Sequence, residues 1–357
     1  MSDLRKKERD TSANPMHESC AAPSRDAVEL APPGRWHRPL EGESAKGASG
    51  VRPFMQVDVF TPTALLGNPL AVVLDGGGLT DAQMLQFANW TNLSETTFLL
   101  PPTDAGRAGG ADYRVRIFTP GGEMRFAGHP TLGSCHAWLQ AGGQPQSAQQ
   151  IVQECPVGLV PIRRDGSLLS FAAPPLQRSA PSPMVLARVA AALGLKAQDV
   201  RAAQLLDNGT TWLGLLLDDP HTVLQLKPNQ LELKNLGHKV GVAAVYPAPE
   251  APVLIVRSNR EARAFGQSAA VSAEEEPALE VRAFAAPMGI AEDPVTGSLN
   301  ASLAQWLIAD GHMPERYLAA QGTCLDRAGR IHIHRDSSGQ VWVGGAVVTC
   351  IDGVVTL

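Results

Sequence analysis

The chain has 357 residues, of which 44% are hydrophobic and 18% are charged. This composition can bury a sizeable core and lies far from the disordered class, and the length predicts two domains. The formal net charge of -5 and the pI near 6.0 provide no basic field for nucleic acid and no attraction to a membrane surface. We therefore expect neither nucleic acid nor membrane as a partner.

The cysteines and the N-terminus indicate the compartment. The five cysteines are scattered and nowhere show the CxxC spacing, so we expect reduced thiols and no cysteine metal site. The first residues are charged, no long apolar run follows them, and no stretch reaches the roughly 18 apolar residues of a membrane-spanning helix. The predicted location is the cytoplasm.

Regular patterning begins after the first 53 residues, which lack any apolar period and predict a disordered N-terminal extension over 1–53. Residues 55–60 alternate like a strand, and residues 71–74 are expected to pair with them. Thr80, followed three residues later by Gln83, is typical of a capping box and predicts a helix to about residue 92. Residues 96–100 are strand-like, so Glu95 falls in a short junction between a helix and a strand.

An internal repeat links the two halves of the chain. Residues 115–118 (VRIF) precede residues 128–137 (GHPTLGSCHA), and residues 281–284 (VRAF) precede residues 292–301 (EDPVTGSLNA). Four residue types recur at a constant offset of 164, which makes His129 equivalent to Asp293. Each copy predicts a strand, a glycine and proline loop, and a helix, over residues 131–140 and 296–308.

A weaker similarity links residues 95–98 (ETTF) to residues 209–212 (GTTW). It places glycine where the first half has Glu95. The repeat would then be symmetric in its scaffold and asymmetric in its chemistry.

The two loops and Glu95 form the candidate site. A helix start presents unpaired N–H groups and the positive end of the helix dipole, so both loops suit a carboxylate or an oxyanion. Gly128 and Gly297 would let the backbone approach a ligand closely. Partial burial of Glu95 would raise its pKa toward the working pH, and His129 and Asp293 could polarise a substrate group. The plain alternatives are tight turns for the loops and a solvated surface position for Glu95.

Other patterns give no cofactor site. His332 and His334 share one face of a strand-like run, but no third ligand is apparent in the sequence. Residues 76–78 (GGG) lack the lysine and hydroxyl residue of a phosphate loop, and no GxGxxG motif opens a helix. We therefore expect neither a metal nor a nucleotide cofactor.

Six motifs, in order from about residue 55 to the C-terminus, resemble the phenazine-biosynthesis PhzF-like family. They are residues 58–61 (DVFT), 67–69 (GNP), 92–96 (NLSET), 118–120 (FTP), 128–131 (GHPT) and 292–298 (EDPVTGS). The resemblance implies an α+β, diaminopimelate-epimerase-like fold, in which two pseudo-symmetric domains each wrap a curved, mostly antiparallel sheet around a central helix. We accordingly expect a first domain over 54–175, a second over 176–345, and a C-terminal strand over 346–357 that returns to the first.

The resemblance also implies a chemistry. The characterised member of the family isomerises a dihydro-hydroxyanthranilate by moving a hydrogen between ring carbons, with a glutamate as acid and base and with no cofactor. The positions that match the family's acid/base glutamate, its first-loop contacts and its second-loop contacts are, in that order, Glu95, then Gly128 and His129, then Asp293, Gly297 and Ser298. Of these we expect Glu95, His129 and Asp293 to be catalytic and the other three to bind substrate.

Three functions are open at this point. The first is a cofactor-independent isomerase of a small carboxylated metabolite, with Glu95 moving the proton. The second is an epimerase or racemase that uses Glu95 with a second acid such as Asp293. A two-cysteine racemase is disfavoured because Cys135 lies seven residues beyond Gly128. The third is a non-catalytic metabolite-binding protein. The family likeness also implies a homodimer.

Overall fold

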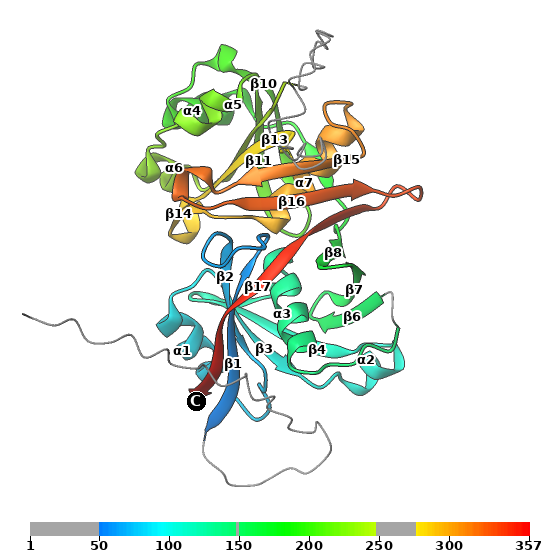
Figure 1. The fold of residues 1–357 in the computed structure, drawn as a ribbon. Helices are drawn as coiled ribbons and strands as arrows, with labels where there is room; N and C mark the ends of the chain where they lie inside the picture. The colour runs from blue at the N-terminus through cyan, green and yellow to red at the C-terminus, as the bar shows by residue number, and fades with distance from the viewer. Residues whose placement is uncertain (1–49, 148–149, 248–275) are drawn as a thin grey trace, which may run out of the picture. The chain divides into compact units, whose positions relative to one another are not determined.

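The first strand begins earlier than its pattern predicts. The computed structural model describes residues 50–147, 150–247 and 276–357 (Figure 1), and residues 49–357 form one compact unit. Most of the predicted N-terminal extension lies outside the described residues, as does Cys20. Only residues 50–53 of that extension are described. Strand β1 (Val51–Val59) starts at Val51 because the C-terminal strand β17 (Val341–Thr356) pairs with it along its whole length, with Val51 opposite Thr356.

Eight strands close into a ring through successive pairings. β2–β3 and β4–β6 are parallel, and the other six pairings are antiparallel. β17 closes the ring because its first part pairs with β8 and its second part pairs with β1. In ring order the strands are β1, β2 (Asn68–Val73), β3 (Thr96–Leu100), β4 (Tyr113–Thr119), β6 (Gln150–Cys155), β7 (Gly158–Asp165), β8 (Leu168–Ala172) and β17.

A second series of strands repeats the same kinds of pairing. Here β11–β12 and β13–β15 are the parallel pairs, and the remaining pairs are antiparallel. In pairing order the strands are β9 (Gln177–Ser179), β10 (Val200–Asp207), β11 (Thr211–Leu217), β12 (Lys239–Val245), β13 (Leu279–Ala285), β15 (Arg316–Gln321), β16 (Gly329–Arg335) and β17. Short strands β5 (Gly122–Met124) and β14 (Ile290–Asp293) pair with β4 and β13.

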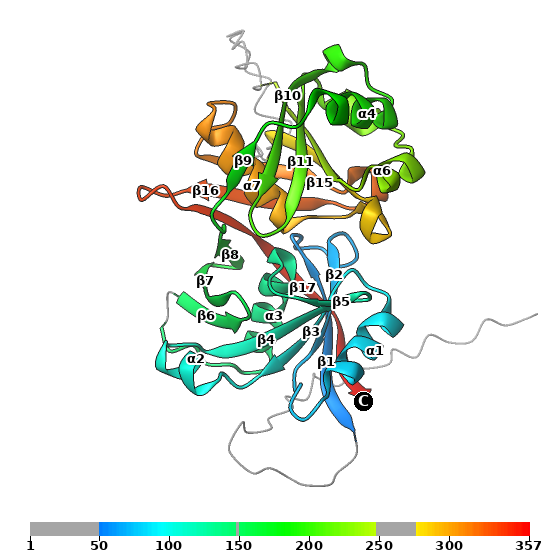
Figure 2. The same ribbon diagram turned by 180° about the vertical axis from the view of Figure 1, so that it is seen from behind.

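Each series of strands packs around one central helix (Figures 1 and 2). Helix α3 (Gly128–Gln140) contacts β1, β2, β3, β4, β6, β8 and β17, and small residues let it fit. A Cβ added at Gly133 would lie 2.5 Å from Cδ2 of Leu70. Helix α7 (Gly297–Ala309) is buried along almost its whole length. Helices that are buried on all sides belong in a core rather than on a surface.

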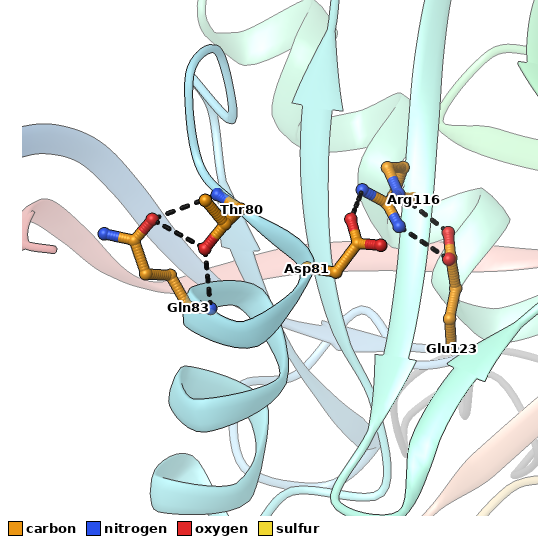
Figure 3. Close-up of polar contacts among 5 residues, drawn as sticks. All are labelled: Thr80, Asp81, Gln83, Arg116 and Glu123. Atoms are coloured by element: carbon orange, nitrogen blue, oxygen red, sulfur yellow. Dashed lines mark hydrogen bonds and ion pairs between the residues drawn. The ribbon is translucent and has the colours of Figure 1, made fainter.

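The peripheral helices pack outside the strands, and α1 (Asp81–Thr91) leads to the site. Thr80 Oγ1 accepts from the backbone N–H of Gln83, and Gln83 Oε1 accepts from the backbone N–H of Thr80, which confirms the predicted capping box (Figure 3). Arg116 on β4 forms ion pairs with Asp81 and Glu123. The other helices are α2 (Asp104–Ala108), α4 (Pro183–Leu193), α5 (Pro220–Gln225) and α6 (Gln230–Leu236). No helix in the described ranges combines the length and the apolar composition that crossing a bilayer requires.

The strand registers correct the weaker of the two predicted equivalences. Phe118 of β4 lies opposite Thr96 of β3, and Phe284 of β13 lies opposite Val240 of β12. Because residues 115–118 and 281–284 are the repeated strands, β12 is the counterpart of β3, whereas β11 is the counterpart of β2. The second-half counterpart of Glu95 is therefore Lys239, and the predicted match to residue 209 is wrong.

The offset of 164 is also wrong beyond the repeated strands. Helices α3 and α7 begin 169 residues apart, at Gly128 and Gly297. The repeated strands are 166 residues apart. Of the three extra residues in the second copy, two lie in the turn that holds the 3-10 helix η2 (Ala286–Met288) and one is a bulge where β14 pairs with β13. His129 therefore corresponds to Ser298. Asp293, at the end of β14, corresponds to the last residue of β5 rather than to His129.

Candidate active site

One pocket collects all six predicted site residues. It lies where the first turns of α3 and α7 meet, and residues from both series of strands line it. The six predicted residues are Glu95, Gly128, His129, Asp293, Gly297 and Ser298. Sequence reasoning missed the rest of the lining, which includes Ser94, Met124, Phe126, Thr210, Trp212, Lys239, Met288 and Ile290.

The two predicted glycines are required because the helix starts touch each other. A Cβ added at Gly128 would lie 2.5 Å from Cζ of Phe171 and 3.2 Å from Cα of Gly297. A Cβ added at Gly297 would lie 3.1 Å from Cα of Gly128. Separations near 3 Å to backbone atoms force a movement of one helix, so glycine at both positions brings two helix N-termini together at one pocket.

Side chains do not cap these two helices. The N-cap residues Ala127 and Thr296 make no side-chain hydrogen bond to the first turn of α3 or α7. Thr131 Oγ1 donates to the Ala127 carbonyl, and Asn300 Nδ2 donates to the Thr296 carbonyl, both at 2.9 Å. Uncapped first-turn N–H groups and the aligned dipoles favour an anion at both helix starts.

Glu95 reaches the pocket from the junction between α1 and β3. Helix α1 ends at Thr91, and the next residue, Asn92, has a left-handed backbone with φ 55° and turns the chain toward β3. The Glu95 side chain is 14% exposed, and its Oε2 lies 3.5 Å from Nε2 of His129. Burial raises the pKa of Glu95, while Ser94 and the positive charge of Lys239 act in the opposite direction. A carboxyl group with a raised pKa is suited to accept and return a proton.

His129 occupies the first turn of α3 and is uncharged at neutral pH. Its side chain is 6% exposed. Burial lowers its pKa to about 4, although the charge of Asp293 opposes that change. A neutral imidazole beside Glu95 can donate or accept one hydrogen bond at each ring nitrogen.

Asp293 brings a second carboxyl group to the pocket. Its Oδ1 accepts from Asn68 Nδ2 at 3.1 Å, and its Oδ2 accepts from Thr296 Oγ1 at 2.5 Å. Burial, and then the negative charge of Glu95, raise the pKa of Asp293 to about 6. Two carboxyl groups in one pocket disfavour simultaneous ionisation, so they can act as an acid and a base.

A polar chain from the second half completes the lining. Lys239 Nζ donates to Thr210 Oγ1 and lies 4.8 Å from the centre of the Trp212 ring. Trp212 Nε1 in turn donates to Ser298 Oγ at 3.2 Å. Lys239 could have been found by extending the repeat backwards from the two VRxF strands, since strand pairing places it at the position of Glu95.

The pocket lining offers neither a pair of catalytic cysteines nor a group of metal ligands. None of its lining residues is a cysteine, and Cys135 is buried in the core along α3, where burial raises its pKa to about 12. Within the described residues, no group of three or more His, Cys, Asp and Glu side chains could hold a metal ion. His332 and His334 both lie on β16, outside the pocket.

Comparisons with known proteins place this chain in a family. The family model described as phenazine biosynthesis-like protein, PhzC-PhzF, matches residues 57–353. Antisense-enhancing sequence 1 of Schizosaccharomyces pombe is 33% identical over 317 residues, which are 84% of this chain and 97% of that protein. The trans-2,3-dihydro-3-hydroxyanthranilate isomerase of Pseudomonas aeruginosa is 28% identical over 295 residues, 80% of this chain and 91% of that protein. The crystal structure of a PhzF-family protein from Bacillus anthracis matches with a TM-score of 0.68 at 21% identity, over 86% of this chain and 99% of that chain.

The chain therefore belongs to the PhzC-PhzF family of phenazine biosynthesis-like proteins, which confirms the resemblance seen in its motifs. Several relatives are named isomerases, and the protein is an enzyme of this isomerase family. The match to the Bacillus anthracis structure confirms the broad fold class, in which mixed sheets include a closed ring of strands.

Proposed function

We propose that this protein is a cofactor-independent isomerase that moves a proton within a small carboxylated metabolite, and that Glu95 carries the proton. The observation that supports this most strongly is the position of the Glu95 carboxyl group. It is 14% exposed, 3.5 Å from the imidazole of His129, and in the same pocket as the two helix starts. We also propose that residues 54–175 and 176–345 act as two pseudo-symmetric domains that shield this pocket.

The proposed reaction has two proton transfers. The Glu95 carboxylate removes a proton from a carbon next to an unsaturated group, and the electron pair of the broken C–H bond moves into that group. The helix starts at Gly128 and Gly297 and the neutral His129 stabilise the resulting negative charge. The Glu95 carboxyl, whose proton exchanges with solvent between the two transfers, then delivers a proton to a different carbon on the same face, so no redox partner is required.

The pocket lining and the name of one relative support the proposed substrate class. Uncapped helix starts favour a carboxylate, and apolar side chains such as Met124, Phe126 and Ile290 favour a compact carbon skeleton. The Pseudomonas aeruginosa relative is named for trans-2,3-dihydro-3-hydroxyanthranilate, a cyclic amino acid with a carboxylate. We therefore propose this compound, and cyclic amino and hydroxy acids like it, as the first ligands to test.

Epimerisation is a second candidate, and the position of Asp293 favours it. Asp293 lines the same pocket as Glu95, and its pKa is raised to about 6. A proton removed by one carboxyl group and delivered by the other on the opposite face would invert a stereocentre. Inverted product in a chiral assay would support this second reaction over the isomerisation.

The test of the proposed function combines binding with turnover. A thermal-shift screen of small cyclic amino and hydroxy acids, with trans-2,3-dihydro-3-hydroxyanthranilate included, identifies ligands of the wild-type protein. Glu95→Gln is then expected to keep the thermal shift but to lose turnover of each hit by about 1000-fold or more, since its amide cannot accept the proton. Unchanged turnover by Glu95→Gln would reject the proposal.

The family likeness also supports a homodimer and a cytoplasmic location, which we retain as proposals. A dimer would give about twice the 37.8 kDa mass of the chain in light scattering. A mass equal to that of one chain at micromolar concentration would reject the dimer.

A further inference from the structure

Glu95 and Lys239 occupy equivalent positions in the two halves of the molecule. Each follows a helix that ends with a left-handed residue, Asn92 after α1 and Gly237 after α6. Each then stands one residue before the position, Thr96 or Val240, that pairs with the phenylalanine of the repeated strand. The pseudo-symmetry therefore brings a carboxylate from one half and an ammonium group from the other to the same pocket.

The ammonium group of Lys239 has room for an anionic partner. Among the described residues, no carboxylate lies within ion-pair distance of it. Its one hydrogen bond is donated to Thr210 Oγ1, and its other contact is with the Trp212 ring. A lysine ammonium has three donors, so two remain for a ligand.

The surroundings fix where the Lys239 side chain lies. Thr210 precedes β11 and Trp212 lies within it, and Trp212 is itself held by its hydrogen bond to Ser298 Oγ at the start of α7. Burial lowers the pKa of Lys239, and the negative charges of Asp207, Glu95 and Asp293 act in the opposite direction. A side chain held in this way can bind a ligand without first being ordered.

We propose that Lys239 binds the carboxylate of the substrate and so determines specificity, at the position in the second half that mirrors Glu95 in the first. This inference rests on the proposed function, because it assumes an anionic substrate in this pocket. The carboxylate would lie between the ammonium group and the start of α7, and the carbon skeleton would extend toward Glu95. Lys239 is then a binding residue and does not transfer the proton.

The test is an equilibrium binding experiment that does not require turnover. The probes are 3-hydroxyanthranilate, an aromatic compound with a carboxylate, and its uncharged carboxamide, measured by calorimetry with the full chain. Wild type is expected to bind the carboxylate about 10-fold or more tightly than the carboxamide, as a hydrogen-bonded charge requires. Lys239→Met and Lys239→Gln are expected to weaken carboxylate binding by about the same factor and to leave carboxamide binding unchanged.

Two further comparisons separate a binding role of Lys239 from a structural one. Lys234→Met removes an exposed lysine from α6 and is expected to change neither affinity. Lys239→Gln keeps a group that can hydrogen bond to Thr210, so its fold is expected to survive if that of Lys239→Met does not. Circular dichroism shows whether each variant is folded.

The outcomes distinguish this inference from the proposed function. Retention of the preference for carboxylate in both Lys239 variants would overturn the inference even if Glu95→Gln abolishes turnover. Equal affinity of wild type for the two probes, or binding of neither, would overturn it too. Loss of the preference for carboxylate in the Lys239 variants supports the inference. This holds even if Glu95→Gln leaves turnover intact and the proposed reaction is rejected.

Discussion

Nε2 of His129 lies 3.5 Å from Oε2 of Glu95, and within the described residues neither atom has a hydrogen-bond partner. Burial lowers the pKa of His129 to about 4, so this contact is between a neutral imidazole and a carboxyl group at neutral pH. Unpaired buried polar atoms are costly. A ligand that hydrogen bonds to both atoms would remove that cost, which is the reason for expecting the reacting group of the substrate here.

His129→Asn should lower kcat by about 100-fold, the lower end of the loss when one hydrogen-bond donor to a developing negative charge is removed. The matched control is His136→Asn on the same helix, whose Nε2 lies 2.9 Å from Thr349 Oγ1 outside the pocket. Steady-state kinetics between pH 6 and 9 measure both. Because the pKa of His129 lies near 4, no His129 titration should appear in that range. An acidic limb that disappears in His129→Asn would contradict this view of its charge.

Gly297→Ala should impair both stability and turnover. Its Cβ would lie 3.1 Å from Cα of Gly128, and because that neighbour is backbone, the two helix starts must separate. Overpacking of this kind costs about 1–3 kcal/mol. The control is Gly121→Ala, where an added Cβ would meet only Thr119 Oγ1, at an ordinary 3.7 Å. Urea unfolding gives the free energies, and a Gly297→Ala protein as stable and active as wild type would show that the contact is not tight.

Asp293→Asn should change the pH dependence of stability. The folded pKa of Asp293 is about 6 against an ordinary 3.8, so its contribution is fully present below about pH 3.8 and is lost as the pH rises through 6. The asparagine variant avoids that loss. Its free energy of unfolding should exceed that of wild type at pH 8 by up to about 3 kcal/mol more than at pH 4.

The control for this prediction has the opposite sign. Arg178 binds the carboxylate of Asp310 through two hydrogen bonds and lowers its pKa. That contribution is present above the unfolded pKa and is lost as the pH falls through the folded value. Asp310→Asn should therefore destabilise the protein more at pH 8 than at low pH. The same pH trend in both variants would contradict the assigned direction for Asp293.

Thr80→Ala should destabilise the protein without changing the chemistry. It removes the side-chain acceptor of the capping box shown in Figure 3, which costs about 1 kcal/mol. Thr80→Ser keeps the hydroxyl group and should remain close to wild type. Since Thr80 lies at the far end of α1 from Glu95, kcat should stay within about 2-fold of wild type. A loss of turnover as large as that of His129→Asn would indicate that α1 positions the base directly.

Local patterns were sufficient to predict the elements around Glu95. The pair Thr80 and Gln83 predicted the start of α1 correctly, and the strand-like segment 96–100 predicted β3 with its observed bounds. These features depend on hydrogen bonds and residue types within a few positions, so they can be predicted from the sequence. The same reasoning placed Glu95 at the junction. The internal repeat pointed to Gly128, His129, Asp293 and Gly297, and the family motifs added Ser298; all of them line the pocket.

The relation between the halves could not be predicted in the same way. Pro130 lies inside the first turn of α3, whereas Pro294 lies in the loop before α7, so matching them by identity gave an offset of 164 and a false pairing of His129 with Asp293. The insertion at η2 (Ala286–Met288) becomes visible only through strand register. Lys239 was missed for this reason, because its equivalence with Glu95 depends on which strands pair.

The direct test of proton transfer by Glu95 is deuterium incorporation from D₂O into a ligand identified by the thermal-shift screen, followed by NMR. Wild type should label the reacting carbon, and Glu95→Gln should bind the ligand yet label it about 1000-fold more slowly or not at all. Glu280→Gln is the matched control, since burial also raises the pKa of Glu280, and this residue lies outside the pocket. Its labelling should stay at the wild-type rate. Labelling by Glu95→Gln at the wild-type rate would contradict the assignment of Glu95 as the base.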